Sequence, residues 1–242
     1  MTSSYLIEFN NYDHSFCEAT IYSNGAEYIN SITALFISFI GLFGLYYNTT
    51  DINSSMMYYS LVLNGITSCA YHHTHYIGWG LLDRYSMVFV AAYCYNVFIN
   101  LIIKDYPFIS HLLRFLIVSY LTILSTFTGL HNEPMFNILF GIFLLSVIMF
   151  IISLSYVYKL NKIIFIYGAK GVILISVGAL SWIVTENLCY RYSIVKYLMG
   201  HSLWHIAVSL GGYYISLIPL LQYKNTSLLK FKYNIPYVGV FD

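Results

Sequence analysis

The segment SCAYHHTHYIGWGLLDRYSM, residues 68–87, concentrates groups that are able to bind a metal or move a proton. His72, His73 and His75 stand within four positions, and Asp83 follows eleven residues after the first of them. Charged and imidazole groups cost free energy inside a bilayer, so such a cluster in an apolar chain indicates a partner or a function.

A second pair of histidines stands near the C-terminal end, in GHSLWHIAVSLGG. His201 and His205 are four residues apart, so on a helix they lie on one face about one turn apart. This spacing lets one helix offer two imidazoles to a metal. A histidine pair in a helix is also common as hydrogen-bonded structure, so the pair alone leaves both interpretations open.

A third imidazole would complete the ligand pattern of catalytic zinc, which is three protein ligands and one open position. The predicted set is His72, His201 and His205. Zinc lowers the pKa of a water in the open position to about 7, and Asp83 is then the predicted general base. Ser68, one turn before the first histidine, is predicted to donate a hydrogen bond to an oxyanion or to that water.

His73 and His75 compete for the same role. His75 stands three residues after His72, so a metal-binding pair from this helix is geometrically allowed. We favour the alternative that His73 and His75 face the lipid headgroups, where amphipathic side chains are common.

Composition places these residues in a membrane protein. Of the 242 residues, 59% are hydrophobic and 9% are charged, whereas an ordinary soluble domain has about 25% charged residues. The formal net charge of +1 argues against a nucleic-acid partner, because nucleic acid requires a basic surface. The N-terminal segment has neither a basic n-region nor an apolar h-region, so we expect no cleavable signal peptide.

Seven apolar stretches are long enough to cross a bilayer as helices. Helices are favoured because they satisfy their own backbone groups in lipid. The expected fold is therefore all-α, an integral membrane bundle of seven transmembrane helices in a single domain over 1–242. We expect an extramembrane segment over 1–26, the helices over 27–221 and a cytoplasmic tail over 222–242. The expected spans are 27–48, 56–77, 82–103, 107–127, 135–158, 163–186 and 197–221.

The distribution of Lys and Arg predicts the orientation, since both prefer cytoplasmic loops. With the N-terminus lumenal or extracellular, three cations fall outside, namely Arg84, Arg191 and Lys196. Six fall inside: Lys104, Lys159, Lys162, Lys224, Lys230 and Lys232. This orientation brings the histidines, Asp83 and Glu186 to one membrane face at similar depth. We expect an internal membrane such as that of the ER or Golgi.

Several blocks together resemble the alkaline ceramidases and the wider CREST superfamily of seven-helix membrane hydrolases. The first is Ser68-x3-His72-x10-Asp83, and far downstream GHSLWHIAVSLGGYY is close to the seventh-helix signature of the family. EYINSITALFISFIGLFGLY looks like the first helix, and LSWIVTENLC resembles the sixth. The blocks occur in order and at the right distances over most of the chain.

The resemblance implies hydrolysis of the amide bond of ceramide to sphingosine and a free fatty acid, at a zinc site within the membrane. Carried over by position, the zinc ligands are His72, His201 and His205. Asp83 is then the catalytic acid/base group, and Ser68 assists at the metal or the oxyanion. The expected partner is ceramide or a related sphingolipid in the bilayer; the oligomeric state is left open.

The resemblance also implies a disulfide between Cys17 and Cys189, because family members pair a cysteine before the first helix with one after the sixth. Both positions lie on the predicted outer side, where a disulfide persists.

A calcium site in the N-terminal segment is a further implication of the family. Glu18 and Glu27 match its acidic pattern, whereas Ser15 and Thr20 stand where an Asp and an Asn are expected. Asp13 is a substitute, since hard cations bind several oxygen ligands. The alternative is a solvated acidic segment that orients the protein. The candidate calcium ligands are Glu18, Glu27, Asp13, Ser15 and Phe16.

Three other interpretations stay open. An adiponectin-receptor-type protein has a similar seven-helix site, but usually a larger soluble N-terminal region and the reverse orientation. A haem-binding electron carrier would pair axial histidines and would not need Asp83. A divergent relative would bind lipid without hydrolysing it.

Overall fold

Seven long helices make up most of the chain that the structure describes. In order, the elements are η1 (Cys17–Thr20), α1 (Tyr28–Asn48), α2 (Ile52–Thr74), α3 (Ile77–Ile102), α4 (Pro107–Gly129), α5 (Glu133–Val157), α6 (Lys162–Leu188), η2 (Val195–Leu198), α7 (Gly200–Tyr223), β1 (Leu229–Lys232) and β2 (Ile235–Val238). The structure is a computed structural model that describes residues 9–13, 15–48, 52–102, 107–129, 133–157, 162–223, 229–232 and 235–238.

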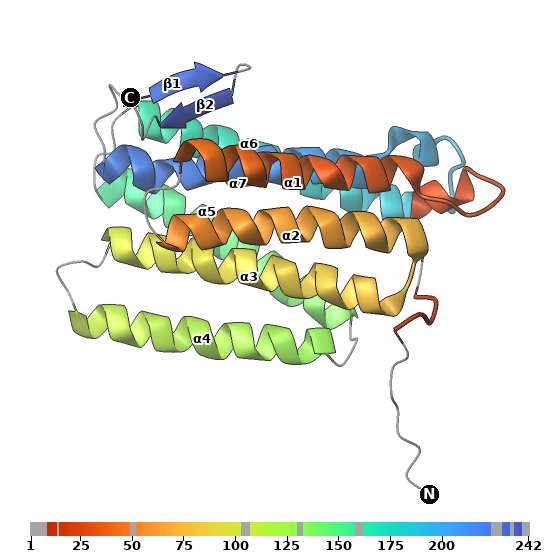
Figure 1. Ribbon diagram of the computed structural model, residues 1–242, viewed down its shortest axis with the longest axis horizontal. Helices are drawn as coiled ribbons and strands as arrows, with labels where there is room; N and C mark the ends of the chain where they lie inside the picture. The colour runs from red at the N-terminus through yellow and green to blue at the C-terminus, as the bar shows by residue number, and fades with distance from the viewer. Residues whose placement is uncertain are drawn as a thin grey trace, which may run out of the picture.

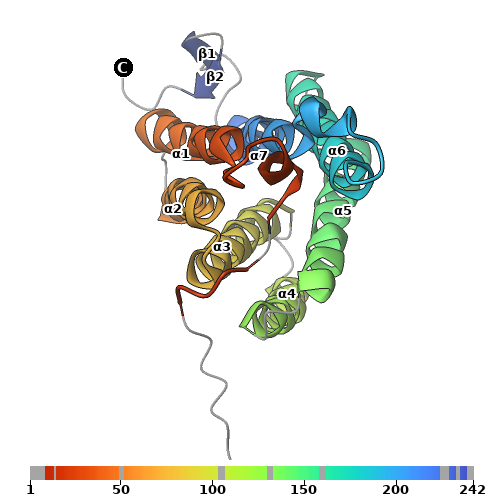
Figure 2. The ribbon, with the colours of Figure 1, turned by 90° about the vertical axis from the view of Figure 1, so that its right-hand side faces the viewer.

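The long helices lie side by side with roughly parallel axes (Figure 1). Seen end-on, α1 to α7 follow one another around the bundle, and α7 packs against both α6 and α1 (Figure 2). η1 and the α6–α7 connection lie at one end, which we call the η1 end, and the hairpin of β1 and β2 lies at the other. Successive helices therefore run in opposite directions, so the end of α2 and the start of α7 meet at the η1 end.

Small residues let the helices on one side of the bundle approach closely. A Cβ at Gly65 of α2 would collide with the backbone and side chain of Ser38 on α1. Across the same contact, Ser38 Oγ donates a hydrogen bond to the Val62 carbonyl oxygen at 2.7 Å. Close backbone approach and interhelical hydrogen bonds are the means by which helices associate in lipid. This packing fixes the relative depth of α1 and α2.

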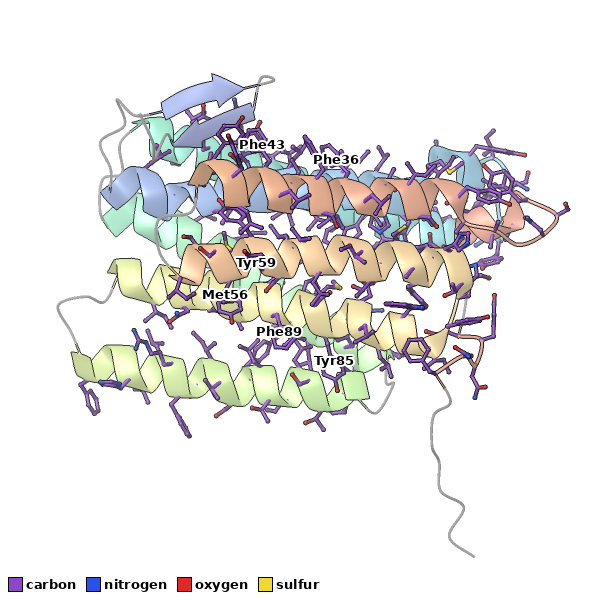
Figure 3. All side chains as sticks on the ribbon, viewed as in Figure 1. Phe36, Phe43, Met56, Tyr59, Tyr85 and Phe89 are labelled. Carbon is purple, nitrogen blue, oxygen red and sulfur yellow. A yellow bond between two sulfur atoms is a disulfide. The ribbon has the colours of Figure 1, made fainter. Side chains whose placement is uncertain are left out.

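Large apolar side chains cover the outside of the bundle (Figure 3). Phe108 is 79% exposed and Leu180 is 63% exposed. Apolar surface on this scale indicates contact with a membrane. Three described segments are long and apolar enough to cross one: Tyr28–Asn48, His111–Thr128 and Phe165–Leu188. The protein is thus helical, as predicted, and has the surface of a membrane protein. The short antiparallel hairpin of β1 and β2, within the predicted tail, is an addition to the expected all-α fold.

The connection between α2 and α3 differs from the prediction. α2 ends at Thr74 and α3 begins at Ile77, so Asp83 lies nearly two turns inside α3 and does not open it. His75 has a φ of 55°, and this left-handed conformation ends α2. The N-terminal segment holds the turn, since the Asp13 N–H donates to the His75 carbonyl oxygen at 2.8 Å.

Arg84, which was counted among the cations on the outer side, is buried within α3. Its Nη2 lies 3.1 Å from Oδ2 of Asp13, and the Tyr71 hydroxyl donates to the same oxygen at 2.8 Å. α3 begins at Ile77, before the predicted start at 82, so Arg84 lies further inside the helix than predicted. Of the cations predicted inside, Lys104, Lys159 and Lys224 lie outside the described residues.

Candidate metal centre and active site

His72, His201 and His205 lie together at the η1 end of the bundle. All three are buried, and their possible ligand atoms lie within 4.8 Å of one another. His201 and His205 come from the first two turns of α7, as their spacing predicts, and His72 comes from the last turn of α2. Three imidazoles that converge on one point are a donor set that fits zinc with an open fourth position.

The residue before α1 and a residue in its second turn hold the Nδ1 atoms of two of these imidazoles. His72 Nδ1 donates to Oε2 of Glu27 at 2.6 Å, and His205 Nδ1 lies 3.1 Å from the hydroxyl oxygen of Thr33. Such partners fix the ring orientation and tautomer of metal-binding histidines. Because Nδ1 is occupied, Nε2 of His72 and His205 is the atom left for a metal.

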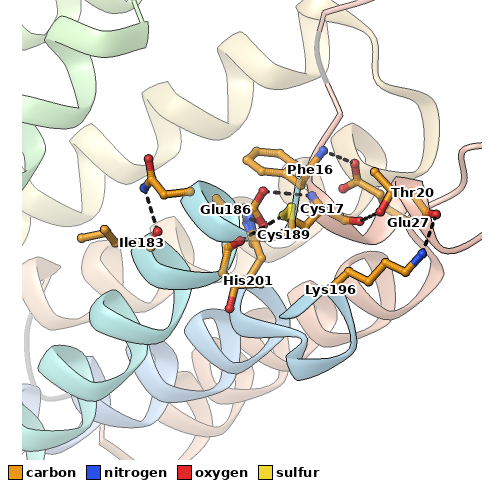
Figure 4. The surroundings of a disulfide bond; sticks show 11 residues. Phe16, Cys17, Thr20, Glu27, Ile183, Glu186, Cys189, Lys196 and His201 are labelled. Carbon is orange, nitrogen blue, oxygen red and sulfur yellow. Dashed lines mark hydrogen bonds and ion pairs between the residues drawn. A yellow bond between two sulfur atoms is a disulfide. The ribbon is translucent and has the colours of Figure 1, made fainter. Parts of the chain in front are cut away.

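The predicted disulfide between Cys17 and Cys189 is present and joins η1 to the residue after α6 (Figure 4). The two Cα atoms are 6.1 Å apart. Oε2 of Glu186 accepts a hydrogen bond from the Cys17 N–H at 2.9 Å, and its Oε1 lies 3.9 Å from His201 Nδ1. Glu186 therefore connects the disulfide to the third imidazole.

Phe16, in the N-terminal segment, packs against two of the imidazoles. Its ring centroid is 4.1 Å from that of His201 and 5.1 Å from that of His72. The Phe16 N–H donates to Oε1 of Glu27 at 2.6 Å. The Glu27 carboxylate therefore accepts hydrogen bonds from both His72 and Phe16.

An elongated cavity extends from the histidines into the bundle. Asn64, Ser68, Asp83 and Arg84 make its wall polar near the histidines. From His201 to Ile215 it follows fourteen residues of α7, about 21 Å along the helix axis. The rest of its wall is mostly apolar and includes Leu61, Val90, Phe140, Ile175 and Val208.

Asp83 lies on this wall beside two polar residues of α2. Asn64 Nδ2 donates to Oδ1 of Asp83 at 2.8 Å, and the same amide nitrogen lies 2.9 Å from Ser86 Oγ. Ser68 is a further hydrogen-bonding neighbour of the Asp83 carboxyl. Asn64 was not predicted as a site residue. The signal that points to it is its spacing, because it stands four residues before Ser68 and eight before His72, on one face of α2.

The two remaining histidines of the first cluster have different surroundings. His73 is exposed, as predicted. His75 is buried, and the prediction that it faces the headgroups is wrong. Its Nδ1 lies 3.6 Å from Oε1 of Glu27, and its ring packs 5.6 Å from the ring of Tyr12. The left-handed turn places this side chain beneath the N-terminal segment.

The three acidic candidates for calcium ligands, Glu18, Glu27 and Asp13, accept hydrogen bonds from protein donors. The two carboxylate oxygens of Glu18 accept backbone N–H groups of Ile29 and Asn30, each at 2.7 Å. Burial raises the pKa of the Glu18 carboxyl above its usual value, and these two bonds act in the opposite direction. Glu27 and Asp13 bind protein donors too. Calcium therefore stays a prediction that these contacts do not support.

The comparison with known families identifies this chain. The model of one family, described as Ceramidase, matches residues 11–238. None of the curated proteins matches the chain.

Proposed function

The chain belongs to the ceramidase family, and we propose that it is a zinc-dependent intramembrane hydrolase that cleaves the amide bond of ceramide to give sphingosine and a free fatty acid. One observation carries the proposal. The buried imidazoles of His72, His201 and His205 converge at the polar end of an apolar cavity, and Asp83 lies on the wall of the same cavity.

The donor set supports zinc as the metal. His72, His201 and His205 would hold it, with Glu27 and Thr33 orienting two of the rings. Bound zinc supplies a Lewis acid that polarises the amide carbonyl and acidifies water near neutral pH.

Asp83 is the proposed general base and general acid. Its carboxylate takes a proton from the attacking water as the water oxygen bonds to the carbonyl carbon. The same proton then passes to the amide nitrogen while the C–N bond breaks, which releases the amine and the acid. Ser68 hydrogen-bonds the Asp83 carboxyl. Once Asp83 has taken the proton, the Ser68 hydroxyl is released to donate to the carbonyl oxygen, where negative charge develops. Asn64 keeps the Asp83 carboxylate in place.

The shape of the cavity supports a lipid as the substrate. Its polar groups lie at one end, near His201. From there the cavity runs parallel to the helices as far as Ile215, about 21 Å along α7 in all, and its wall beyond the polar end is mostly apolar. A lipid amide placed with its amide at the histidines would bury a hydrocarbon chain along this length. Ceramide has this combination of one amide and long chains.

We further propose that all seven helices cross the membrane, with the η1 end lumenal or extracellular. The four helices outside the three segments named above lie alongside them in the same bundle. α2, α3, α5 and α7 contain 23, 26, 25 and 24 residues. At 1.5 Å per residue each exceeds the hydrocarbon thickness of about 30 Å. The disulfide at the η1 end supports an oxidising compartment, such as the lumen of the ER or Golgi.

The test measures metal content and ceramide turnover in detergent for the wild type, His205→Ala and His73→Ala. The matched control is His73, which is exposed on α2. Near-stoichiometric zinc and released sphingosine, both lost in His205→Ala and kept in His73→Ala, are the expected results. If the protein binds zinc but hydrolyses no ceramide, the substrate would be a different lipid amide. A protein without zinc would overturn the mechanism, and a haem absorption band would then be the next measurement.

A further inference from the structure

Gly211 and Gly212 are neighbours in α7 but meet different surroundings. A Cβ at Gly211 would come within 2.6 Å of Ile175 Cγ1 and 2.8 Å of the Gly171 carbonyl oxygen, so this glycine serves the close contact of α6 with α7. Around a Cβ at Gly212, no atom of the described chain lies within 4 Å. Helix packing therefore explains why position 211 is a glycine. It does not explain why position 212 is one.

The space beside Gly212 is the cavity of the site, because Gly212 is one of the residues that line it. It stands seven residues after His205, nearly two full turns, so both residues lie on the same face of α7. Val208 and Ser209, between them on this face, also line the cavity. A side chain at position 212 would extend into the cavity about 10 Å along the axis from His205.

The cavity continues beyond Gly212, and apolar side chains line it there. Cys94 lies eleven residues beyond Asp83 on α3, which is about 16 Å along that helix. Phe143 of α5 and Ile215 of α7 complete the wall, and both belong to the buried core of the bundle. Because glycine has no side chain, the cavity is larger at position 212 by about the volume of one side chain, and a bound molecule is able to fill that space.

We propose that Gly212 sets the length of the hydrocarbon chain that the cavity accepts. The inference rests on the proposed function, since it places the amide of a lipid at the histidines and its chain along α7. A chain that extends beyond the first three turns of α7 passes Gly212, and a side chain there would block it. The absence of a side chain at this position selects for long-chain lipid amides.

The test compares the wild type with Gly212→Leu and Gly141→Leu on ceramides whose N-acyl chain increases from short to long. Gly141, on α5, is a matched control because no described atom lies within 4 Å of a Cβ there, and it is not among the described residues that line the cavity. We expect the ratio of long-chain to short-chain kcat/KM to fall at least about tenfold in Gly212→Leu, since one misfitting methylene changes kcat/KM by about 10- to 200-fold. Gly141→Leu should keep the wild-type ratio.

A second series, in which the length of the sphingoid base varies, shows which of the two substrate chains passes Gly212. A fall in the ratio in either series supports the proposal. Unchanged ratios in both series, at normal zinc content, would overturn it. Should Gly212→Leu fail to fold, Gly212→Ala adds a single methyl group and should shift the ratio in the same direction by a smaller factor.

Binding of saturated fatty acids separates this proposal from the proposed hydrolysis, because binding needs no turnover. Trp182 and Trp204 line the cavity, so their fluorescence in a Trp79→Phe background reports entry of a chain. Weaker binding of long but not short fatty acids to Gly212→Leu would support the chain-length role even if the wild type hydrolysed no ceramide. The opposite result is also possible: both proteins hydrolyse ceramide, bind fatty acids equally well and have the same ratio of long-chain to short-chain kcat/KM. This result would support the proposed hydrolase function but contradict the role of Gly212.

Discussion

His72 Nδ1 donates a hydrogen bond of 2.6 Å to Oε2 of Glu27, which joins the last turn of α2 to the residue before α1. Each of these residues is 1% exposed. Hydrogen bonds between an imidazole and a carboxylate are shorter and stronger than neutral ones, and this one determines the orientation of the ring. Since Glu27 also accepts the Phe16 N–H, the N-terminal segment and a proposed metal ligand share one carboxylate.

Glu27→Gln is expected to weaken zinc binding about 10- to 100-fold, the range found when a residue that orients a ligand is lost. The neutral amide accepts a weaker hydrogen bond from His72. Competition with a chromogenic chelator in detergent measures the affinity. Glu186→Gln is the comparison, and its effect should be smaller because this carboxylate lies 3.9 Å from His201 Nδ1. Equal affinities of Glu27→Gln and the wild type would show that Glu27 does not orient the site.

Asn64→Ala is expected to lower kcat by up to about 100-fold, because a misplaced catalytic group loses that much. Asn64 contacts the proposed base and none of the proposed zinc ligands in the described hydrogen bonds, so KM and zinc content should stay near the wild-type values. Asn187→Ala, an exposed change on α6, is the control.

Asn64→Ala should lower kcat much less when Asp83→Asn is already present. The reason is that the effects of substitutions at two residues that act together are not additive. Steady-state kinetics of the four proteins of this cycle measure the coupling. Additive losses would assign Asn64 a structural role.

Reduction of the Cys17–Cys189 disulfide is expected to lower the free energy of unfolding by about 2–4 kcal/mol. The bond closes a loop with a sequence separation of 172 residues, and it anchors the segment that carries Phe16. Thermal denaturation with and without reductant measures the effect. Cys69→Ala/Cys94→Ala should respond to reductant as the wild type does, because both cysteines are free. A melting temperature that reductant leaves unchanged would contradict this expectation.

Asp13→Asn is expected to cost about 3–5 kcal/mol of stability, because it removes the carboxylate partner of a buried guanidinium. Arg84→Met in the same chain should restore part of the loss, since apolar residues often replace a buried ion pair without cost. Melting temperatures of the two single variants and the double variant test this. If the double variant is less stable than Asp13→Asn, the ion pair is not the source of the effect.

Local pattern alone was enough to predict the helices and two of the three proposed metal ligands. His201 and His205 share a face through their four-residue spacing, whatever the rest of the chain does. The apolar runs predict helices because each segment in lipid must satisfy its own backbone groups. The pairing of Cys17 with Cys189 and the inclusion of His72 came from the resemblance to a family and the fit to a three-ligand site.

Contacts between distant segments determined the rest, and no local pattern contains them. The bond from His72 to Glu27 spans 45 positions of sequence, that from Arg84 to Asp13 spans 71, and neither pairing was predicted. The inward position of His75 follows from a left-handed turn that the N-terminal segment stabilises.

The physical reason is that sequence periodicity shows which residues share a face of one helix. A contact between two helices depends in addition on how each helix is rotated and how deep it lies in the bundle. Asn64 shares a predictable stripe with Ser68, yet its bond to Asp83 exists because α3 starts at Ile77 and so carries Asp83 down to the level of Asn64. The depth of one helix relative to another is set by packing, for example by the close contact of Gly65 of α2 with α1.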